Sequence, residues 1–275
     1  MISKLFRQIL VSALLFFGVF YVLAQVDWAS MVPIDRERVE CYLGEWVWNS
    51  YKSQYREIEN KAVVGPVDKL LTRLCEANGV ERDGIKLRVV RASEVNAFAG
   101  PNGYLVVHSA LISECENENE LAGVLAHELA HIEKEHVWST MKKELGLSLF
   151  FISLSGNVEQ LAELTKILAS SFYSREQETE ADCILVAYLC NAGLNPEGMV
   201  RFMQRMSEDD DGYIPEWMST HPDWEHRIAT LRAAMNEQSV KKSSNVISTE
   251  AWKRMKRNLG EKAKSSKSAI KQKKI

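Results

Sequence analysis

The sequence predicts an α+β fold that is predominantly helical and contains one small, mainly antiparallel sheet. Three short segments with strand character lie close together between residues 85 and 108, whereas almost everything from Asn117 to Met235 has helical spacing. With 275 residues, of which 46% are hydrophobic and 26% charged, the chain has the composition of an ordinary globular protein. It is long enough to bury a sizeable core.

Residues 1–26 are predicted to form a membrane anchor or a signal segment. Lys4 and Arg7 precede an apolar run of 16 residues, from Ile9 to Ala24. This run is slightly short for a membrane-spanning helix, which needs about 17–25 residues. It is also slightly long for the apolar core of a signal peptide, which has about 7–15 residues. We favour the anchor; in both interpretations Lys4 and Arg7 stay in the cytoplasm and the rest of the chain is exported.

A linker and an N-terminal helix are expected over residues 27–65. Apolar residues recur with helical spacing from about residue 36 to residue 60, and Gly65-Pro66 is expected to break this pattern. Pro66 then lies at a suitable start for a second helix over residues 67–77.

The three segments with strand character are residues 85–90, 96–99 and 104–108. The last two are separated by the turn residues Gly100-Pro101-Asn102-Gly103, and this arrangement predicts a hairpin within the sheet.

Helices are expected to follow one another from Asn117 onward. The first runs to about Trp138, and others are predicted at residues 158–172, 175–191 and 222–235. The very apolar stretch at 145–154 is too short for a membrane span and is expected to be a buried helix. An acidic loop is expected at residues 208–211.

The chain ends in a basic tail, residues 238–275, which is expected to be disordered except for a helical patch near residues 252–259. From Lys241 to the end there are 12 Lys or Arg residues against two Glu, a net charge of +10. Since the whole chain carries −3, the preceding 240 residues carry −13. An exported protein with such an acidic body is not expected to bind nucleic acid.

One short stretch carries a chemical pattern: His127-Glu128-Leu129-Ala130-His131. Two histidines four residues apart share one face of a helix, so their imidazoles can bind one metal ion, and the glutamate beside the first can accept a proton from water at that ion. The same spacing also arises by chance in amphipathic helices. Residues 120–126, however, are mostly small and apolar, which predicts a buried helix. A buried histidine pair needs partners, and zinc would supply them.

A catalytic zinc ion takes three protein ligands, so a third is required. The pattern HExxHxxGxxH is excluded, because Lys134 and Val137 stand where it needs glycine and histidine. His136 is rotated off the ligand face and is expected behind the ligands or at the surface. The remaining source is a downstream acidic helix, where two pairs of carboxylates share a face: Glu178 with Asp182, and Glu176 with Glu180. Chemistry alone does not choose between the two pairs.

Four motifs taken together resemble the HtpX- and BepA-type zinc endopeptidases, relatives of the CAAX prenyl proteases within the gluzincins. The motifs are HELAH at 127–131, SREQETEAD at 174–182, NAFAGPNGY at 96–104 and STHP at 219–222 with Arg227-Ile228. The resemblance covers residues 66–235. It implies a zinc metallopeptidase domain over residues 66–237. The fold of this domain is expected to be zincin-like, with the sheet beside the HExxH helix. The family often has a glycine pair in the turn where this chain has Pro101-Asn102-Gly103.

The resemblance also implies roles for single residues. Glu178 becomes the third ligand, beside His127 and His131, to one zinc ion per chain. Asp182 is then the partner that orients a ligating histidine. His221 is expected near the metal, as a fourth ligand, a gate or a stabiliser of the transition state, and Arg227 is expected to pair with the site carboxylates or to stabilise an oxyanion.

The expected function is therefore hydrolysis of peptide bonds, with Glu128 as the general base. The substrate is expected to bind as an extended strand along Tyr104, Leu105, Val106 and Val107, next to Asn96. Such binding favours unfolded polypeptides, so quality control of envelope proteins is the expected role. A chaperone or assembly factor that rarely cleaves is the alternative; a prenyl-protein protease is disfavoured because there is one convincing hydrophobic segment.

The expected location is the bacterial cell envelope. The N-terminal segment would anchor the chain in the inner membrane, with the catalytic domain on the periplasmic side. If the segment is cleaved, the protein would be soluble in the periplasm.

Overall fold

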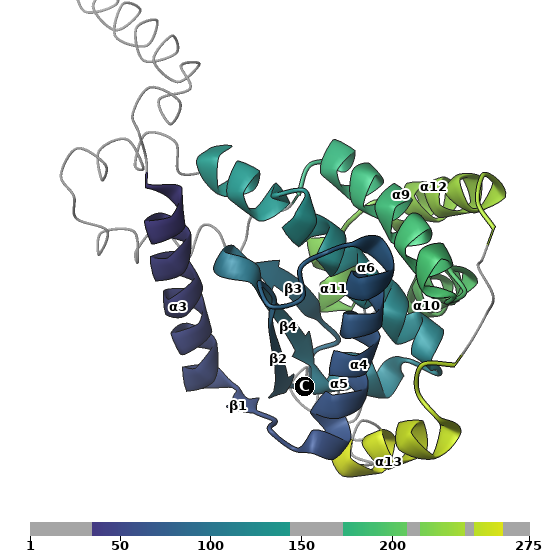
Figure 1. Ribbon diagram of the computed structural model, residues 1–275, viewed down its shortest axis with the longest axis horizontal. Coiled ribbons are helices and arrows are strands. Elements are labelled where there is room, and N and C mark those ends of the chain that lie inside the picture. Colours follow the sequence, from purple (N-terminus) through teal and green to yellow (C-terminus); the bar gives the residue numbers. More distant parts are fainter. Residues whose placement is uncertain (1–34, 144–172, 208–214, 240–244, 261–275) are drawn as a thin grey trace, which may run out of the picture.

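The computed structural model describes residues 35–143, 173–207, 215–239 and 245–260 (Figure 1). Several predicted features lie outside these residues: the leader at 1–26, the apolar stretch at 145–154, the helix at 158–172 and the acidic loop at 208–211. None of the described helices combines the length and the apolar character needed to cross a membrane.

The described residues form helices around one four-stranded sheet, which confirms the predicted α+β, predominantly helical class. The elements are α3 (Arg36–Gln54), β1 (Arg56–Glu57), α4 (Lys61–Asn78), β2 (Lys86–Arg91), β3 (Ala97–Gly100), η1 (Pro101–Gly103), β4 (Tyr104–His108), α5 (Ser109–Glu114), α6 (Glu118–Glu133), α9 (Arg175–Ala192), α10 (Glu197–Ser207), α11 (Glu216–Thr220), α12 (Trp224–Asn236) and α13 (Thr249–Leu259).

The sheet has the strand order β1-β2-β4-β3. The predicted hairpin is present, because β3 pairs with β4 in antiparallel orientation, as β1 does with β2. The central pair, β2 and β4, is parallel. This parallel pair arises because the chain leaves β2, forms β3 at the outer edge and returns into the space between them as β4.

The turn of the hairpin depends on a glycine. Gly103 has a φ of 71°, which L side chains rarely adopt, and a Cβ there would collide with the carbonyl oxygen of Gly84. The glycine therefore lets the hairpin turn pack closely against the chain just before β2. Asn102 also has a positive φ, 60°, which asparagine tolerates better than most residues.

Helices cover both faces of the sheet, with α3 on one side and α4 and α6 on the other (Figure 1). Side chains of β4 alternate between these faces: Leu105 and Val107 join the large core with α4 and α6, whereas Tyr104 and Val106 pack with Trp48 of α3. Because β4 is buried on both faces, all five of its residues are buried.

Helix α4 begins six residues earlier than the sequence predicted, and the expected break at Gly65-Pro66 is wrong. Asn60 caps the helix by accepting a hydrogen bond from the N–H of Ala62, and Pro66 lies inside the helix. A proline normally disfavours helical conformation in the residue before it through a clash with that residue's Cβ. Here that residue is Gly65, which has no Cβ and is exposed.

Helix α6 is shorter than predicted, because it ends at Glu133 instead of near Trp138. Glu135 has a φ of 56°, a left-handed conformation that redirects the chain before helical structure resumes at residues 136–143. The turn places the His136 ring next to the His131 ring, with their Nδ1 atoms 2.9 Å apart.

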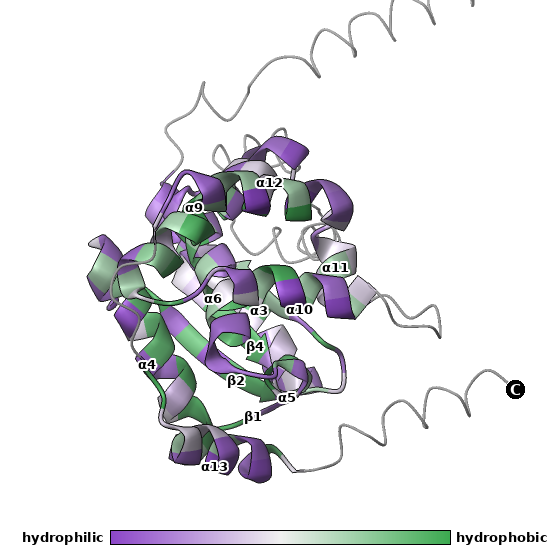
Figure 2. Ribbon diagram, turned by 90° about the vertical axis from the view of Figure 1, so that its right-hand side faces the viewer, coloured by the Kyte–Doolittle hydropathy of each residue, from purple (hydrophilic) through white to green (hydrophobic). Residues whose placement is uncertain are grey.

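Part of the tail that was expected to be disordered is folded. Helix α13 packs beside α4 at one end of the molecule, with hydrophilic residues on its outward turns (Figure 2). Val246, Ile247, Met255 and Leu259 are buried in the main core. The predicted helical patch near residues 252–259 is thus confirmed, whereas the disorder expected outside that patch is wrong for residues 245–251.

Candidate metal centre

Helix α6 presents His127 and His131 on one face, in a completely buried environment. Their Nε2 atoms lie 3.0 Å apart, and the two rings meet edge to face. One turn before His127, Gly123 packs the same helix closely against Met199 of α10, where a Cβ would collide with the methionine side chain. The predicted pair of histidines is therefore brought together inside the protein.

Helix α9 supplies the carboxylate that faces these histidines. This carboxylate belongs to Glu178. Its Oε1 atom lies 3.5 Å from Nε2 of His131, and its Oε2 atom lies 3.4 Å from Nε2 of His127. A capping box at Ser174 and Gln177 fixes the start of α9, so Glu178 falls on the turn that packs against α6. The rival carboxylates, Glu176 and Glu180, are exposed.

His221 completes the group from the end of α11. Its Nδ1 atom lies 2.9 Å from Oε1 of Glu178 and 3.2 Å from Nε2 of His127. One side-chain atom from each of His127, His131, Glu178 and His221 lies within 4.8 Å of the others. We call these four residues the His/Glu cluster.

The His/Glu cluster fits a metal ion. Three imidazole nitrogens and one carboxylate oxygen are ligands that zinc accepts. Oε2 of Glu178 is buried and has no hydrogen bond among the described residues, although Nη1 of Arg227 lies 3.2 Å away. The two Nε2 atoms of His127 and His131 face each other at hydrogen-bond distance, so at most one of them carries a proton between them. A cation at the centre would satisfy all of these lone pairs.

Asp182 and Arg227 hold the cluster from behind. Asp182 Oδ1 lies 3.1 Å from Nδ1 of His127, and the Arg227 guanidinium donates to both oxygens of Asp182, at 2.8 Å each. Arg227 also donates to the carbonyl of His221 at 3.1 Å. Since its donors are engaged in this way and it is only 1% exposed, the contacts favour the pairing role expected for Arg227 over direct stabilisation of an oxyanion.

The same contacts set the charges of the two carboxylates. Burial alone would raise the pKa of Glu178, but the facing histidines outweigh burial and hold that pKa far below its usual range. Burial would likewise raise the pKa of Asp182, and the Arg227 charge beside it lowers that pKa instead. Both carboxylates are therefore ionised, which a metal ligand and its partner require.

His136 lies behind the second histidine of the motif. Its Nδ1 atom is 2.9 Å from Nδ1 of His131, and its Nε2 atom is 3.3 Å from Oε2 of Glu180. Burial lowers the pKa of His136, which favours its neutral form. His136 is therefore placed to fix the orientation of the His131 ring from the side that faces away from the cluster.

Glu128 is completely buried beside the cluster and is held by two donors. Oε1 accepts from Nε1 of Trp217 at 2.9 Å, and Oε2 accepts from the N–H of Ala99 at 3.0 Å. Oε1 also lies 3.4 Å from Nε2 of His221. Its carboxylate is therefore fixed in position directly beside the His/Glu cluster.

Two aromatic residues at the site were missed by the sequence analysis. Trp217 positions Glu128 and stacks on His221, at 5.1 Å between ring centroids. Tyr173 stacks on His131 at 3.8 Å. A signal for Trp217 was present, because it lies four residues before His221 and thus on the same side of one helical turn. Tyr173 directly precedes the capping serine of α9.

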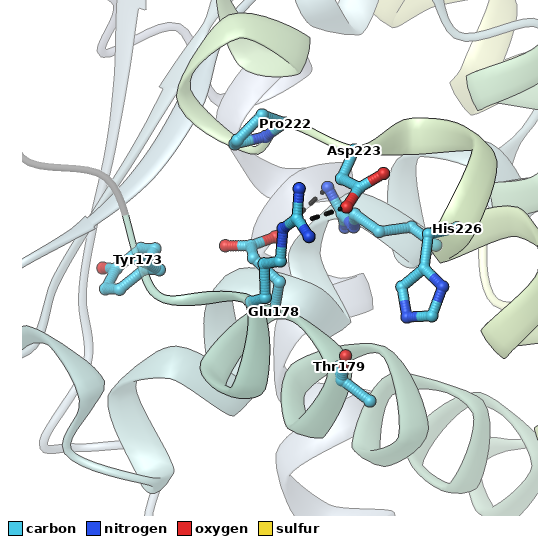
Figure 3. A pocket seen from close by; sticks show the side chains of 8 residues that line it. Tyr173, Glu178, Thr179, Pro222, Asp223 and His226 are labelled. Atoms are coloured by element: carbon cyan, nitrogen blue, oxygen red, sulfur yellow. Dashed lines mark ion pairs between the residues drawn. The ribbon is translucent and has the colours of Figure 1, made fainter.

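A cavity of about 230 Å³ lies beside the cluster (Figure 3). Glu178 and Arg227 form part of its lining, and Tyr173, Pro222 and His226 line it from the surrounding chain. An ion pair between Arg175 and Asp223, 3.2 Å long, joins the start of α9 to the start of α12 at this cavity. The cavity therefore extends to Glu178 of the His/Glu cluster.

The prediction that residues 104–107 form an edge strand that binds the substrate is wrong. Tyr104, Leu105, Val106 and Val107 belong to β4, which has β2 on one side and β3 on the other, so its backbone has no free edge. The edge strand nearest the cluster is β3. Its Ala99 N–H points away from β4, toward Glu128. Asn96, also expected to contact substrate, is buried directly before this strand.

Comparison with known proteins adds a family match. The model of peptidase family M48 matches residues 63–235. The chain is 27% identical over 200 residues to the metalloprotease LoiP of Escherichia coli K12, covering 68% of this chain and 79% of that protein. It is 29% identical over 226 residues to a beta-barrel assembly-enhancing protease of Yersinia pestis, covering 76% of this chain but 46% of that protein. It is also 28% identical over 192 residues to the mitochondrial metalloendopeptidase OMA1 of Schizosaccharomyces pombe, covering 68% of this chain and 57% of that protein.

Proposed function

This chain belongs to peptidase family M48 and is a metalloendopeptidase, and from this premise we propose that it hydrolyses peptide bonds of unfolded or misassembled proteins of the bacterial cell envelope. In this proposal His127, His131 and Glu178 bind one zinc ion, and Glu128 is the general base. The observation that carries the proposal is the buried His/Glu cluster, with its three nitrogens and one carboxylate within 4.8 Å of one another, directly beside the Glu128 carboxylate.

A zinc ion held by His127, His131 and Glu178 would lower the pKa of its bound water toward about 7 and would polarise the scissile carbonyl. The chain supplies the proton transfers. Glu128 accepts a proton from the attacking water and delivers it to the leaving amine. The hydrogen bonds from Trp217 and Ala99 hold its carboxylate in place for both steps.

Three residues orient the proposed ligands. Asp182 accepts a hydrogen bond from Nδ1 of His127, which leaves Nε2 free for the metal. His136 contacts Nδ1 of His131 in the same way, which leaves Nε2 of His131 free for the metal. Arg227 neutralises the charge of Asp182 and ties it to the loop that carries His221.

His221 has two roles compatible with its contacts. Its Nδ1 atom is positioned with the ligand atoms, so it is suited to be a fourth ligand that closes the site at rest. Its Nε2 atom is 3.4 Å from Glu128, so after it leaves the cluster it is near enough to donate to the oxyanion of the transition state.

The substrate is proposed to bind as an extended strand along the free edge of β3. Backbone groups alternate in direction along a strand, so those of Ala97 face the same way as the Ala99 N–H. Pairing through the main chain accepts many sequences but requires an unfolded segment. The proposal of quality control follows from this requirement.

The proposed location is the bacterial cell envelope, with residues 1–26 as an inner-membrane anchor and the catalytic domain in the periplasm. The basic flank and apolar run of the leader support export, and four of the relatives are beta-barrel assembly-enhancing proteases. A soluble periplasmic protein is the alternative. N-terminal sequencing of the mature protein from fractionated cells distinguishes the two, because a cleaved signal would remove the first 24 or so residues.

A chaperone or assembly factor that rarely cleaves is the second candidate. The observation in its favour is that His221 fills the remaining position of the His/Glu cluster. Incubation of the purified, zinc-loaded protein with unfolded casein tests both candidates. Degradation that is lost in Glu128→Gln supports the peptidase, whereas suppression of casein aggregation without cleavage supports the chaperone.

A further inference from the structure

A group of hydrogen-bond acceptors lies at the amino-terminal end of β3. The group, called the acceptor cluster below, consists of Glu94, Asn96, His108 and Glu216. Two backbone hydrogen bonds bring its members together: the N–H of Trp217 donates to the carbonyl of Val95, and the N–H of His108 donates to the carbonyl of Asn96, both at 3.0 Å. None of the four takes part in the chemistry proposed above.

His108 contributes a ring nitrogen, Nε2, whose lone pair accepts no hydrogen bond from the described residues. Its side chain is completely buried, and its Nδ1 atom lies 3.1 Å from the carbonyl oxygen of Glu94. A carbonyl can only accept, so the proton of the ring is on Nδ1. Burial lowers the pKa of His108, which keeps the ring neutral. Its Nε2 atom is then an acceptor, and it has no partner among the described residues.

Two further buried acceptors are also without partners in the described part of the chain. These are Oε2 of Glu94 and Oδ1 of Asn96, whose side chain is only 3% exposed. The Asn96 amide lies beside the Glu216 carboxylate, where it acts to lower the pKa of Glu216. Buried acceptors are almost always satisfied in native proteins, and three in one place indicate a missing donor.

Within the described part of the chain, the negative charge of the acceptor cluster has no cationic partner. Neither Glu94 nor Glu216 forms an ion pair with any lysine, arginine or histidine that the structure describes. Burial and the neighbouring Glu94 charge raise the pKa of Glu216. The missing donor should therefore be a cation.

Aromatic rings surround this position. The ring centroids of Tyr51 and Tyr55 lie 5.9 Å and 5.3 Å from that of His108, and Phe98 of β3 lies 4.9 Å from Tyr51. Both tyrosines are half-buried, so their rings remain accessible from solvent. Aromatic faces attract ammonium and guanidinium groups as well as the apolar stems that carry them.

We propose that the acceptor cluster binds the cationic side chain of a lysine or arginine in the polypeptide substrate, and so sets cleavage specificity. This inference rests on the proposed peptidase function. Ala99 contacts the general base Glu128, and a strand advances about 3.3 Å per residue, so Ala97 lies two residues along the same free edge and Asn96 directly precedes it. A substrate strand on β3 therefore brings the side chain one to three positions from its scissile bond next to the acceptor cluster.

Two quenched fluorescent peptides that differ only in one lysine or methionine test this inference. The position of the lysine is taken from cleavage sites mapped in casein. The zinc-loaded wild-type protein should have a kcat/KM at least about tenfold higher for the lysine peptide, since hydrogen bonds to a charged group are worth that much or more. In the double variant Glu94→Gln/Glu216→Gln this ratio should fall toward one. The matched double variant Glu76→Gln/Glu237→Gln, which alters two exposed carboxylates elsewhere, should keep it.

The binding of the same peptides to Glu128→Gln, measured by fluorescence anisotropy, separates the two hypotheses. Tighter binding of the lysine peptide that depends on Glu94 and Glu216 supports the acceptor cluster even if no peptide is cleaved. Equal kcat/KM values with equal binding overturn this inference and leave the peptidase function intact. Failure of the zinc-loaded wild-type protein to cleave any peptide overturns the peptidase function, and the binding ratio then decides the inference alone.

Discussion

Asp182 Oδ1 lies 3.1 Å from Nδ1 of His127, the ring nitrogen that does not face the His/Glu cluster. The contact fixes the tautomer of the proposed ligand and raises its basicity. Asp182→Asn should therefore weaken zinc binding by about 10- to 100-fold while the protein still folds. Competition with a chelator of known zinc affinity measures this. Asp68→Asn, at a partly exposed ion pair with Arg82, is the control that should bind zinc as the wild type does. An unchanged zinc affinity in Asp182→Asn would exclude the role of Asp182 in orienting His127.

The choice of Glu178 over its neighbours on α9 gives a second prediction. Glu178→Ala should lose most of its zinc, because it removes the buried carboxylate that faces both histidines of the motif. Glu176→Ala is a matched control on the same helix, two residues away and exposed, and should keep one zinc ion per chain. Elemental analysis after dialysis against a weak chelator provides the measurement. A full zinc content in Glu178→Ala would show that another residue is the third ligand.

Glu128→Gln separates metal binding from proton transfer. The glutamine keeps an oxygen to accept from Trp217 or Ala99, but it cannot take the proton from water. Zinc content should stay at the wild-type level while the rate of casein cleavage falls by about 10²- to 10⁴-fold. Activity at the wild-type level in a zinc-loaded Glu128→Gln protein would exclude Glu128 as the general base.

The sequence predicted the parts of the site that depend on local spacing. His127 and His131 share a face because they are four residues apart, and that holds in any helix. The choice between Glu178 and Glu176 was not local, since it depends on which turn of α9 packs against α6. The resemblance to a known family selected Glu178, and burial now supports the same choice.

The errors have the same origin. Tyr104–His108 was expected to be an edge strand that pairs with the substrate, yet its apolar and β-branched residues are those of a strand buried on both faces. Strand order is decided by how the chain crosses the sheet between β2 and β4, and no local pattern encodes that path. Likewise, α13 has few apolar residues, but two of them, Met255 and Leu259, fall four apart and reach the core.

The five cysteines give a test of the fold that does not involve the site. Cys41 and Cys183 are exposed, whereas Cys75, Cys115 and Cys190 are buried. Burial raises the pKa of Cys75 to about 11 and that of Cys115 further, so both thiols are protonated at pH 8 and cannot attack a disulfide reagent. Titration of the native protein with Ellman's reagent should therefore modify two thiols rapidly, and the remaining three only after unfolding. Rapid reaction of four or five thiols in the native protein would contradict the packing of α4, α5 and α9.

Helix α13 is predicted to be part of the stable domain. Met255 is completely buried against the core that contains α4, so Met255→Ala should lower the free energy of unfolding by about 2–5 kcal/mol. Lys253→Ala, on the exposed side of the same helix, should change it by less than about 0.5 kcal/mol. Urea unfolding followed by tryptophan fluorescence measures both variants. If Met255→Ala is as stable as Lys253→Ala, then α13 is not docked in solution, and residues 245–259 are not part of the stable domain.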